Sequence, residues 1–370
     1  MNRVFINGRY LTQSITGVQR CAAETVRALD QLIVEGEYPA DRWAFTLLLP
    51  RSAPQPTFQR IAARTVGHGV GQWWEQLELP LHARNGVLVS LANAAPIAAE
   101  RQCVTIHDAS VFAVPEAYRP AFRTWYRFMI PALGRRADRV LTVSQFSRDE
   151  LVRRAGISAG KLAVVPNAGE HILAVQPDSG VFAKTGFGDR PYVLVVGSGS
   201  RHKNLQGIVR AQELVPRNDY DVVVVGQRDP RIFGGRGPLP SERIRPIGYV
   251  TDGELRALYE KAVCLLFPSL YEGFGLPTLE AMACGCPVIA SNVASLPEIC
   301  GDAALYCDPR DPGDIARRIS QLLGQPELRH TLRSRALDRA RGYRWRDTAR
   351  GVMAQVMRIV PQREAVGAAG

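Results

Sequence analysis

Residues 267–298 read FPSLYEGFGLPTLEAMACGCPVIASNVASLPE, and this stretch decides the fold. It follows an apolar run that predicts a buried strand, and it opens with a glycine-bearing loop that holds the carboxylate of Glu272. Pro277 is expected at the start of a short helix and Gly285 just past its end, because proline is tolerated at the first helical position and glycine is favoured after the last. A second buried strand is expected to begin at Pro287. The stretch therefore predicts a strand, a loop, a helix and a strand in immediate succession.

The same stretch combines groups that bind phosphate with groups that bind hydroxyls. Backbone N–H groups around residues 274–278 are expected to point out of the helix start, where they can bind a phosphate. Gly273 and Gly275 let the main chain approach a ligand closely. Glu272 and Glu280 would repel a phosphate unless they bind something else, and an ionised carboxylate is a strong acceptor for sugar hydroxyls. A nucleotide diphosphate sugar carries both kinds of group, so the stretch indicates a site for such a molecule.

Alternating strands and helices along the whole chain predict an α/β fold with parallel sheets. Strands are expected at 4–7, 44–49, 87–91, 103–106, 140–143, 163–166, 192–196, 222–225, 244–248, 263–267, 288–290 and 304–306. Capping signals mark helix starts at Thr251 with Glu254 and at Asp311. The expected domains are residues 1–170 and 190–342, joined by a Gly-, Pro- and Asp-rich linker at 171–189.

The composition is that of a globular protein, since 46% of the 370 residues are hydrophobic and 22% are charged. The sequence has no run of about 20 apolar residues that could span a bilayer, and its first residues lack the features of a signal peptide. Seven scattered cysteines, an odd number, favour buried free thiols in a reducing compartment over a disulfide framework. We therefore expect a cytoplasmic protein.

The net charge of +11 raises the question of an anionic partner. Nucleic acid is not expected, because no recognisable binding module is present. Anionic lipid is a candidate: Arg119, Arg123 and Arg127 recur at helical spacing among aromatic side chains, and such a basic helix can lie on a membrane surface. The alternative is a helix whose aromatic side chains lie in the domain core and whose arginines are solvated.

A second set of ligand-binding groups lies in the sequence Gly-Ser-Gly-Ser-Arg-His-Lys-Asn at 197–204. It is not a dinucleotide fingerprint, because His202 stands where the third glycine would be. Arg201 and Lys203 could neutralise a diphosphate as it gains charge on leaving a sugar, without a metal ion, although a solvated basic loop is the alternative. Gly17, at the start of an expected helix, would let backbone N–H groups face the same diphosphate from the first domain.

Polar residues also follow predicted strands of the first domain. His107 and Asp108 come directly after a buried strand, and Asn93 lies in the loop after another. Ligands bind at the carboxyl ends of strands in parallel sheets, so these residues are candidates for contact with sugar or acceptor. Ser144 lies at a similar strand end, or it caps the helix that begins a few residues later.

The frame Glu-Gly-Phe-Gly-Leu-Pro-x-x-Glu, with seven residues between Glu272 and Glu280, resembles the signature of the retaining glycosyltransferases of family 4 (group 1). Arg201 and Lys203 resemble the cationic pair with which this family grips the donor phosphates. The segment around Gly17 resembles its first-domain glycine loop, although one glycine of the usual pair is a threonine here. The resemblance implies the GT-B architecture, in which two Rossmann-like domains face each other across a cleft. It also implies that a C-terminal helix, about 343–360, packs back on the first domain.

The resemblance assigns roles to individual residues. Glu280 would bind the ribose hydroxyls and Glu272 the hydroxyls of the donor sugar, while His107 would contact the sugar and help to position the acceptor. The expected donor-binding residues are Gly17, Gly248, Tyr249, Val250, Gly273, Phe274, Gly275, Leu276 and Glu280. The expected catalytic residues are His107, Arg201, Lys203 and Glu272. Asn93, Asp108 and Ser144 are expected near the sugar or acceptor, and neither a metal ion nor another cofactor is expected.

The segments 5–9, 16–20 and 105–108 most resemble bacterial mannosyl- or rhamnosyltransferases that build O-antigen or exopolysaccharide. The implied acceptor is a growing glycan or a polyprenyl-diphosphate-linked glycan, which would place a basic protein at the inner face of the cytoplasmic membrane. Two alternatives stay open on the sequence: a sugar-nucleotide epimerase of the same architecture, and a non-catalytic protein that binds nucleotide sugars.

Overall fold

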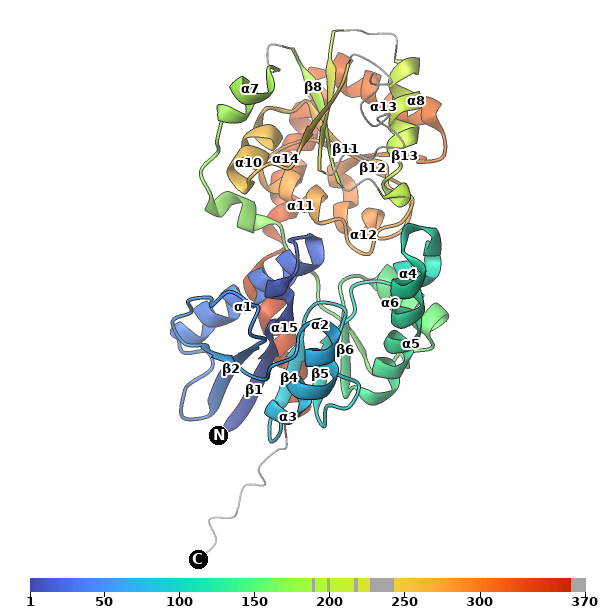
Figure 1. Ribbon diagram of the computed structural model, residues 1–370. Coiled ribbons are helices and arrows are strands. Elements are labelled where there is room, and N and C mark those ends of the chain that lie inside the picture. Colours follow the sequence, from blue (N-terminus) through green and yellow to red (C-terminus); the bar gives the residue numbers. More distant parts are fainter. Residues whose placement is uncertain (188–189, 198–199, 216–218, 227–242, 361–370) are drawn as a thin grey trace, which may run out of the picture.

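The computed structural model describes residues 1–187, 190–197, 200–215, 219–226 and 243–360. Within these residues the chain forms two parallel β-sheets, one of seven strands and one of six, each flanked by helices (Figure 1). The first sheet is built from residues 2–164 and the second from residues 192–307. The predicted α/β architecture of two parallel-sheet domains is confirmed, and the domain boundaries near 170 and 190 stay a prediction.

The first sheet has the strand order β3-β2-β1-β4-β5-β6-β7. Its strands are β1 (Asn2–Asn7), β2 (Trp43–Leu49), β3 (Ala62–Thr65), β4 (Val87–Ser90), β5 (Gln102–Thr105), β6 (Arg139–Thr142) and β7 (Leu162–Val164). The helical segments are η1 (Gly8–Thr12), α1 (Gly17–Val34), α2 (Gly71–Trp73), η2 (Trp74–Glu78), α3 (Leu79–His82), α4 (Ser110–Ala113), η3 (Pro115–Ala117), α5 (Pro120–Arg136) and α6 (Gln145–Ala155). The sequence does not predict β3, because none of its side chains is buried at this edge of the sheet and no apolar pattern results.

The second sheet has the strand order β10-β9-β8-β11-β12-β13. Its strands are β8 (Tyr192–Val196), β9 (Asp221–Val225), β10 (Ile244–Gly248), β11 (Cys264–Phe267), β12 (Val288–Ser291) and β13 (Ala304–Cys307). The helices are η5 (Arg201–Lys203), α8 (Leu205–Leu214), α10 (Asp252–Lys261), α11 (Leu276–Ala283), α12 (Leu296–Cys300), η6 (Gly301–Ala303), α13 (Pro312–Gly324) and α14 (Pro326–Arg341). Both predicted caps are confirmed: Thr251 and Glu254 form a capping box on α10, and the side chain of Asp311 accepts from the backbone N–H of Gly313 at the start of α13.

In each sheet, the strands that follow the first strand in the sequence are added on one side of it and later strands on the other side, so the strand order reverses there. The reversal lies between β1 and β4 in the first sheet and between β8 and β11 in the second. In open parallel sheets a crevice forms at this point, outside the carboxyl ends of the strands, because the connections on either side leave in opposite directions. Side chains that follow β8 and β11 are therefore expected to meet.

The predicted linker is not a simple loop. It contains η4 (Glu170–Ala174) and α7 (Gly180–Thr185), and its residues 188 and 189 lie outside the described part of the chain. Ile172 and Val181 are buried in the core of the second sheet, which gives these two short helices an apolar anchor despite the Gly, Pro and Asp content around them. Packing against the neighbouring core therefore overrides the local composition.

A second segment crosses between the sheets near the C-terminal end of the described chain. Helix α15 (Trp345–Met357) lies beside α1 in the lower body of Figure 1. Ala349, Val352 and Met353 are buried in the first core, and the hydroxyl of Thr348 donates to the carbonyl of Pro166 over 2.7 Å. The first body is thus completed by a helix from the far end of the sequence.

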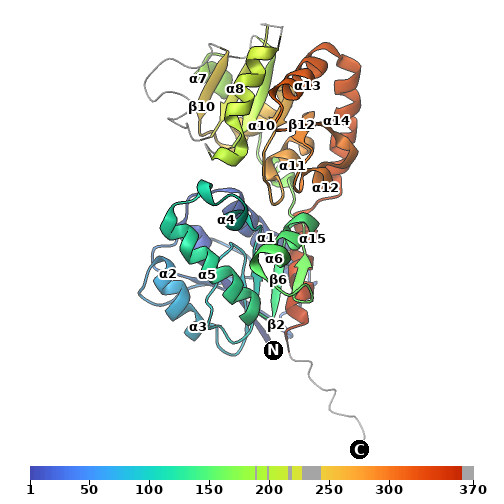
Figure 2. The same ribbon diagram turned by 90° about the vertical axis from the view of Figure 1, so that its right-hand side faces the viewer.

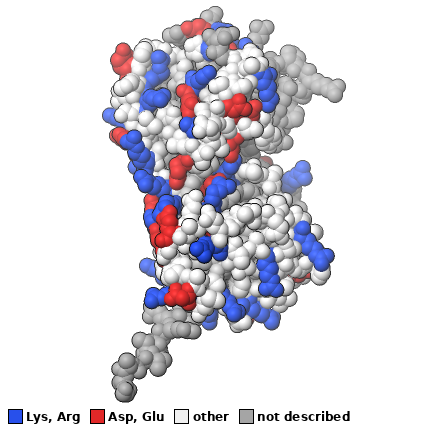
Figure 3. Space-filling model, turned by 90° about the vertical axis from the view of Figure 1, so that its left-hand side faces the viewer, with Lys and Arg blue, Asp and Glu red and all other residues white. Residues whose placement is uncertain are grey.

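The two halves are also joined by polar contacts. Nη2 of Arg20 on α1 lies 2.6 Å from Oδ1 of Asp252 on α10. The backbone N–H of Gln145 at the start of α6 donates to the carboxylate of Glu298 over 2.8 Å. Figure 3 shows charged side chains of both signs along the line where the halves meet on that face. Contacts at several points therefore hold the loops of one sheet against the other.

Candidate active site

The charged pair of Lys203 and Glu272 lies where the strand order of the second sheet reverses. Lys203 ends the segment η5 that follows β8, and Glu272 lies in the loop that follows β11. Nζ of Lys203 is 2.5 Å from Oε1 of Glu272 and 4.9 Å from the centre of the Phe267 ring. Both side chains are mostly buried, so their mutual attraction is screened less than that of an exposed pair, and each charge compensates the other. The structure thus brings together two residues that the sequence assigned to the donor phosphates and the donor sugar.

The segment that carries Lys203 is tied to the loop after β11. Asn204 has the left-handed backbone conformation (φ 59°), and its Nδ2 donates to the carbonyls of Pro268, at 3.1 Å, and of Pro309, at 2.6 Å. The backbone N–H of Leu270 donates to the carbonyl of His202 over 2.7 Å. These bonds hold Lys203 towards Glu272. Arg201, at the start of η5, is exposed, and residues 198 and 199 of the same loop lie outside the described residues.

Gly273 brings the loop of Glu272 into contact with the first sheet. Its carbonyl accepts from the hydroxyls of Ser144, at 2.6 Å, and Ser147, at 3.0 Å. A Cβ atom at Gly273 would lie 2.7 Å from Cβ of Asp108, so only glycine fits here without displacement. Ser144 also accepts from the backbone N–H of Ser147, which confirms that it caps α6. The structure therefore assembles three predicted residues, Asp108, Ser144 and Gly273, at one point between the halves.

The start of α11 differs in one detail from the predicted phosphate site. Gly275 has φ 91°, and a Cβ atom there would lie 2.5 Å from Cδ2 of Leu296, which explains the glycine. The backbone N–H of Thr278 donates to the carbonyl of Gly275 over 2.9 Å. This N–H was expected to face a phosphate, and the structure instead uses it inside the turn. Phe274 and Leu276 are buried, so their side chains anchor this loop in the protein interior.

Glu280 is a buried carboxylate with two partners that the sequence did not indicate. The hydroxyl of Tyr259 donates to Oε2 over 3.0 Å, and Nε2 of His171 lies 3.1 Å from Oε1. Burial, reinforced by the charge of Glu280, raises the pKa of Tyr259 well above its usual value, so the phenol stays protonated and donates. Sequence spacing could not reveal these partners, because all three residues come from different elements.

His107 is directed into the first domain. Its Nε2 lies 3.0 Å from the carbonyl of Leu91, and its backbone N–H donates to Oδ1 of Asn93 over 2.7 Å. Burial lowers the pKa of the imidazole, although the Leu91 carbonyl and the charge of Asp108 oppose this. The ring is therefore neutral at neutral pH, and Asn93 (φ 63°) joins the ends of β4 and β5. A contact of His107 with the sugar stays a prediction.

The other predicted donor-binding residues are more dispersed. Gly17 is the first residue of α1, with open space where a Cβ would lie. Gly248 ends the edge strand β10 with φ 77°, and the next residue, Tyr249, is 77% exposed. Val250 is half-buried against the second core. Gly248, Tyr249 and Val250 lie at or just after the end of β10, which lies two strands away from β8, and their contact with a nucleotide base stays a prediction.

A buried ion pair lies in the first sheet beside the point where its strand order reverses, between β1 and β4. Nε of Arg9 lies 2.9 Å from Oε2 of Glu75, and Nδ2 of Asn7 donates to Oε1 of Glu75 over 2.7 Å. Burial raises the pKa of Glu75 in spite of both partners. Asn7 and Arg9 lie within the N-terminal segment that resembles known transferases, so part of this network had a sequence signal. Glu75 had none, because it faces inward from the π-helical turn η2.

Metal ligands do not cluster in the described residues: no three His, Cys, Asp or Glu side chains there lie close enough to hold an ion. The chemistry that these residues offer is electrostatic. Lys203 and Glu272 provide a cation and a carboxylate where the strand order of the second sheet reverses, and the carbonyl of Gly273 binds the next part of this loop to Ser144 and Ser147 of the first domain.

Comparisons with known proteins connect this geometry with a family. The model of glycosyl transferases group 1 matches residues 181–339, and that of Glycosyltransferase Family 4 matches residues 15–168. The chain belongs to the family 4 glycosyltransferases. This glycosyltransferase is 36% identical over 266 residues to O-antigen chain mannosyltransferase B of Escherichia coli, over 66% of this chain and 67% of that protein. It is 26% identical over 261 residues to the O-antigen chain mannosyltransferase RfbU of Salmonella typhimurium, over 70% and 71%.

The fold of this glycosyltransferase matches that of HepE from Anabaena, solved in complex with UDP and glucose. The TM-score is 0.70 over 97% of this chain and all of that one, at 16% identity, a likeness of fold alone. The family models and the mannosyltransferase relative confirm the predicted family and the assignment as a hexosyltransferase, and the likeness of fold confirms the GT-B architecture. The roles of the individual site residues stay predictions.

Proposed function

We propose that this glycosyltransferase is a retaining, metal-independent enzyme that moves mannose or rhamnose from a nucleotide sugar to a glycan acceptor, free or lipid-linked, in cell-surface glycan synthesis. The Lys203–Glu272 pair beside β8 and β11 carries the proposal, because it combines a phosphate-binding cation with a hydroxyl-binding carboxylate. The similarity to an O-antigen mannosyltransferase over two thirds of the chain favours mannose.

The proposed reaction breaks the bond between the sugar C1 and the diphosphate oxygen. The acceptor hydroxyl attacks C1 from the face that the diphosphate leaves, a new C1–O bond forms, and a phosphate oxygen takes the hydroxyl proton. Negative charge grows on the diphosphate in this step, and Lys203 and Arg201 stabilise it more than they stabilise the bound donor. Glu272 holds the sugar hydroxyls, and Glu280 holds the ribose.

A donor screen tests this proposal. The protein is heated with GDP-mannose, dTDP-rhamnose, UDP-glucose or UDP-galactose, since a ligand that binds only the folded state raises its Tm. The stabilising donor is then incubated with a lipid-linked glycan acceptor, and the product is analysed for the configuration at C1. Retention and transfer without added metal support the proposal. Release of an isomerised free sugar from donor alone would indicate an epimerase instead.

We also propose that the first domain docks on an anionic membrane through α5 and the neighbouring helices α2 and α3. None of the described helices has the length and apolar character to cross a bilayer, so the contact would be peripheral. On α5, Phe122 is 42% exposed and Phe128 59%, beside the predicted Arg119, Arg123 and Arg127. Tyr118, Trp125 and Tyr126 are partly buried against the first domain, as the alternative of a domain helix predicts, and the proposed membrane contact would use the exposed face of α5.

A stripe of apolar side chains on a second segment supports the membrane proposal. Trp73, Leu77 and Leu81 recur every four residues, and all three are exposed, Trp73 by 66%. Figure 2 shows α2 and α3 beside α5 on the lower body. Aromatic and leucine side chains can enter the headgroup layer while the arginines attract anionic lipid. The sequence pattern was not interpreted as a surface stripe, because exposure of these side chains is evident only in the folded chain.

Vesicle sedimentation checks the docking surface. The variant with Arg119, Arg123 and Arg127 changed to serine should lose binding to phosphatidylglycerol vesicles, by about 1 kcal/mol per charge. A control with Arg335 and Arg341 of α14 changed to serine should bind as the wild type does. Equal binding of both variants would contradict the proposed surface.

A further inference from the structure

His171 lies outside the predicted site and contacts Glu280. We propose that His171, fixed by Trp345, is a positioning residue for this carboxylate. In this proposal the chain Trp345–His171–Glu280 couples nucleotide binding to the two segments that cross between the sheets. The inference rests on the proposed role of Glu280 as the ligand of the ribose.

The hydrogen bonds fix which nitrogen of His171 carries the proton. Nε1 of Trp345 lies 3.2 Å from Nδ1 of His171, and an indole N–H can only donate. Nδ1 of His171 must therefore accept, and the proton of the neutral imidazole is on Nε2. That nitrogen lies 3.1 Å from Oε1 of Glu280, so His171 donates to the carboxylate. Trp345 thus selects the tautomer that Glu280 needs.

Glu280 keeps capacity for a ligand in this arrangement. An ionised carboxylate has about four acceptor sites. Tyr259 occupies one on Oε2 and His171 one on Oε1, so each oxygen retains a site for a hydroxyl. Because Tyr259 binds one oxygen and His171 the other, the two hydrogen bonds also fix the orientation of the carboxylate. A pair of vicinal ribose hydroxyls would require such a fixed orientation.

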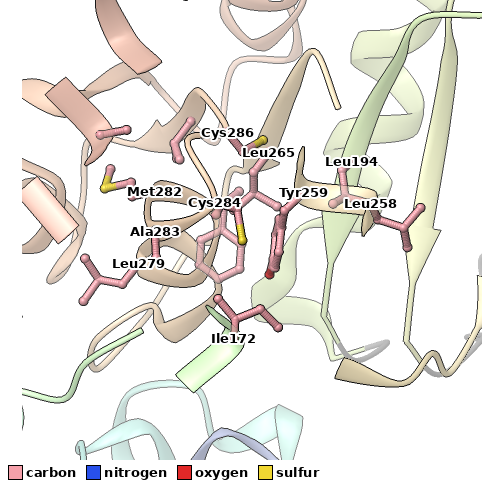
Figure 4. Close-up of a cluster of buried hydrophobic side chains, with 14 of the residues drawn as sticks. Ile172, Leu194, Leu258, Tyr259, Leu265, Leu279, Met282, Ala283, Cys284 and Cys286 are labelled. Carbon is pink, nitrogen blue, oxygen red and sulfur yellow. The ribbon is translucent and has the colours of Figure 1, made fainter. Parts of the chain in front are cut away.

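The segment that carries His171 is packed too closely to move independently of α11. A Cβ atom at Gly169 would lie 2.7 Å from the backbone N of Glu280 and 2.6 Å from the carbonyl carbon of Leu279. Ile172, on the other side of His171, is buried in the same cluster as Leu279 and Tyr259 (Figure 4). The imidazole is therefore held by backbone contact before it, apolar packing after it and the indole beside it.

Trp345 connects the same point to the first domain. Its indole is buried in the first core, at the beginning of α15, and its backbone N–H donates to Oε1 of Glu170 over 2.6 Å. Two neighbouring residues of η4 thus make these two contacts. Glu170 binds the start of α15, the helix that returns to the first sheet, and His171 binds the carboxylate of Glu280 in the second domain. If nucleotide binding shifts the carboxylate of Glu280, the shift should reach the indole of Trp345 through the side chain of His171 alone.

Calorimetric titration of UDP, GDP and dTDP into the full-length protein tests the proposal. For whichever nucleotide the wild type binds, His171→Leu should weaken binding ~10-fold or more, as expected for the loss of a hydrogen bond to a charged group. His171→Gln, whose amide can still donate to Glu280, should stay within about threefold of the wild type. The matched control is Thr348→Val, which removes another bond between the crossing segments, to Pro166, and should bind as the wild type does.

Two further measurements separate positioning from simple stability. In a Glu280→Gln background, His171→Leu should add little further loss of affinity, because the two residues act as a unit. Nucleotide binding should change the tryptophan emission of the wild type, and Trp345→Phe should abolish this change.

The outcomes distinguish the two levels of inference. A wild type that binds none of the three nucleotides would overturn the proposed function and this inference together. A wild type that binds, with a folded His171→Leu variant of equal affinity, would overturn the role of His171 alone. Additive losses in the double variant would likewise show that His171 does not act through Glu280.

Discussion

Lys203 and Glu272, 69 residues apart in the sequence, neutralise each other at 2.5 Å in a site that is mostly buried. A buried charge is costly without a partner, so each side chain holds the other in place until a ligand arrives. In the proposed reaction, a donor would bring a diphosphate for the lysine and hydroxyls for the carboxylate, and it would replace the ion pair with two separate interactions. The ion pair therefore offsets the cost of burying either charge alone.

Replacing Lys203 by alanine should slow sugar transfer ~10²-fold at saturating donor, because the leaving diphosphate loses a preorganised positive charge. Lys184→Ala is the matched control, since Lys184 has an exposed side chain and is paired with a different carboxylate, that of Glu254. Steady-state kinetics with the donor found in the screen gives the comparison. Similar turnover for Lys203→Ala and Lys184→Ala would contradict the assignment.

The lowered pKa of His107 predicts a loss of stability in mild acid. Above pH 6.5, the usual value, the imidazole is neutral in both the folded and the unfolded protein and contributes no pH dependence. As the pH falls through 6.5, the unfolded chain binds the proton first, which favours unfolding. The Tm of the wild type should therefore fall more steeply between pH 7 and 5 than that of His107→Gln. Parallel curves for the two proteins would disprove this prediction.

At the scale of elements, the site depends on short loops that follow strands. The loop after β8 and the loop after β11 meet because the strand order reverses between them. Asn204 fixes the loop after β8 by donating to the carbonyl of Pro268. The hydroxyls of Ser144, which caps α6, and Ser147 fix the loop after β11 by donating to the carbonyl of Gly273. The geometry of the site is therefore set jointly by both sheets.

Gly273→Ala should reduce transfer activity because the added methyl group would lie 2.7 Å from Cβ of Asp108 and force the loop of Glu272 away from the first sheet. Overpacking of this kind costs about 1–3 kcal/mol. Gly324→Ala, where a Cβ meets no atom within 4 Å, is the control. Activity and Tm are measured for both. Full activity of Gly273→Ala would show that the close approach is not needed for catalysis.

At the scale of the whole molecule, two cores are joined by the linker and by α15, which returns to the first body. The seven cysteines lie in hydrophobic clusters of both sheets, and all are free and buried, which confirms the prediction of free thiols. Burial raises the pKa of the Cys103 and Cys264 thiols to about 12, so little reactive thiolate forms at neutral pH.

The folded protein should accordingly resist a thiol reagent such as dithionitrobenzoate at pH 7.5, and all seven thiols should react after unfolding in guanidinium chloride. The number of thiols titrated in each state gives the answer. Rapid reaction of several thiols in the native protein would show that the cores open more readily than their packing implies.

The sequence by itself determined the alternation of strands and helices, because apolar runs, caps, prolines and glycines act over a few residues. It also indicated Glu272, Glu280, Arg201 and Lys203, since their chemistry and spacing are local. It missed β3, whose side chains are exposed, and the helices within the linker, which depend on a neighbouring core.

Only the tertiary structure decided which groups face one another. His171, Tyr259 and Trp345 belong to separate elements, so no sequence spacing places them around Glu280. Glu75 is paired with Arg9 only because η2 packs over the end of β1. Local propensity fixes the elements, whereas the partners of buried polar groups depend on how distant segments pack, and that packing determines the chemistry available to the site.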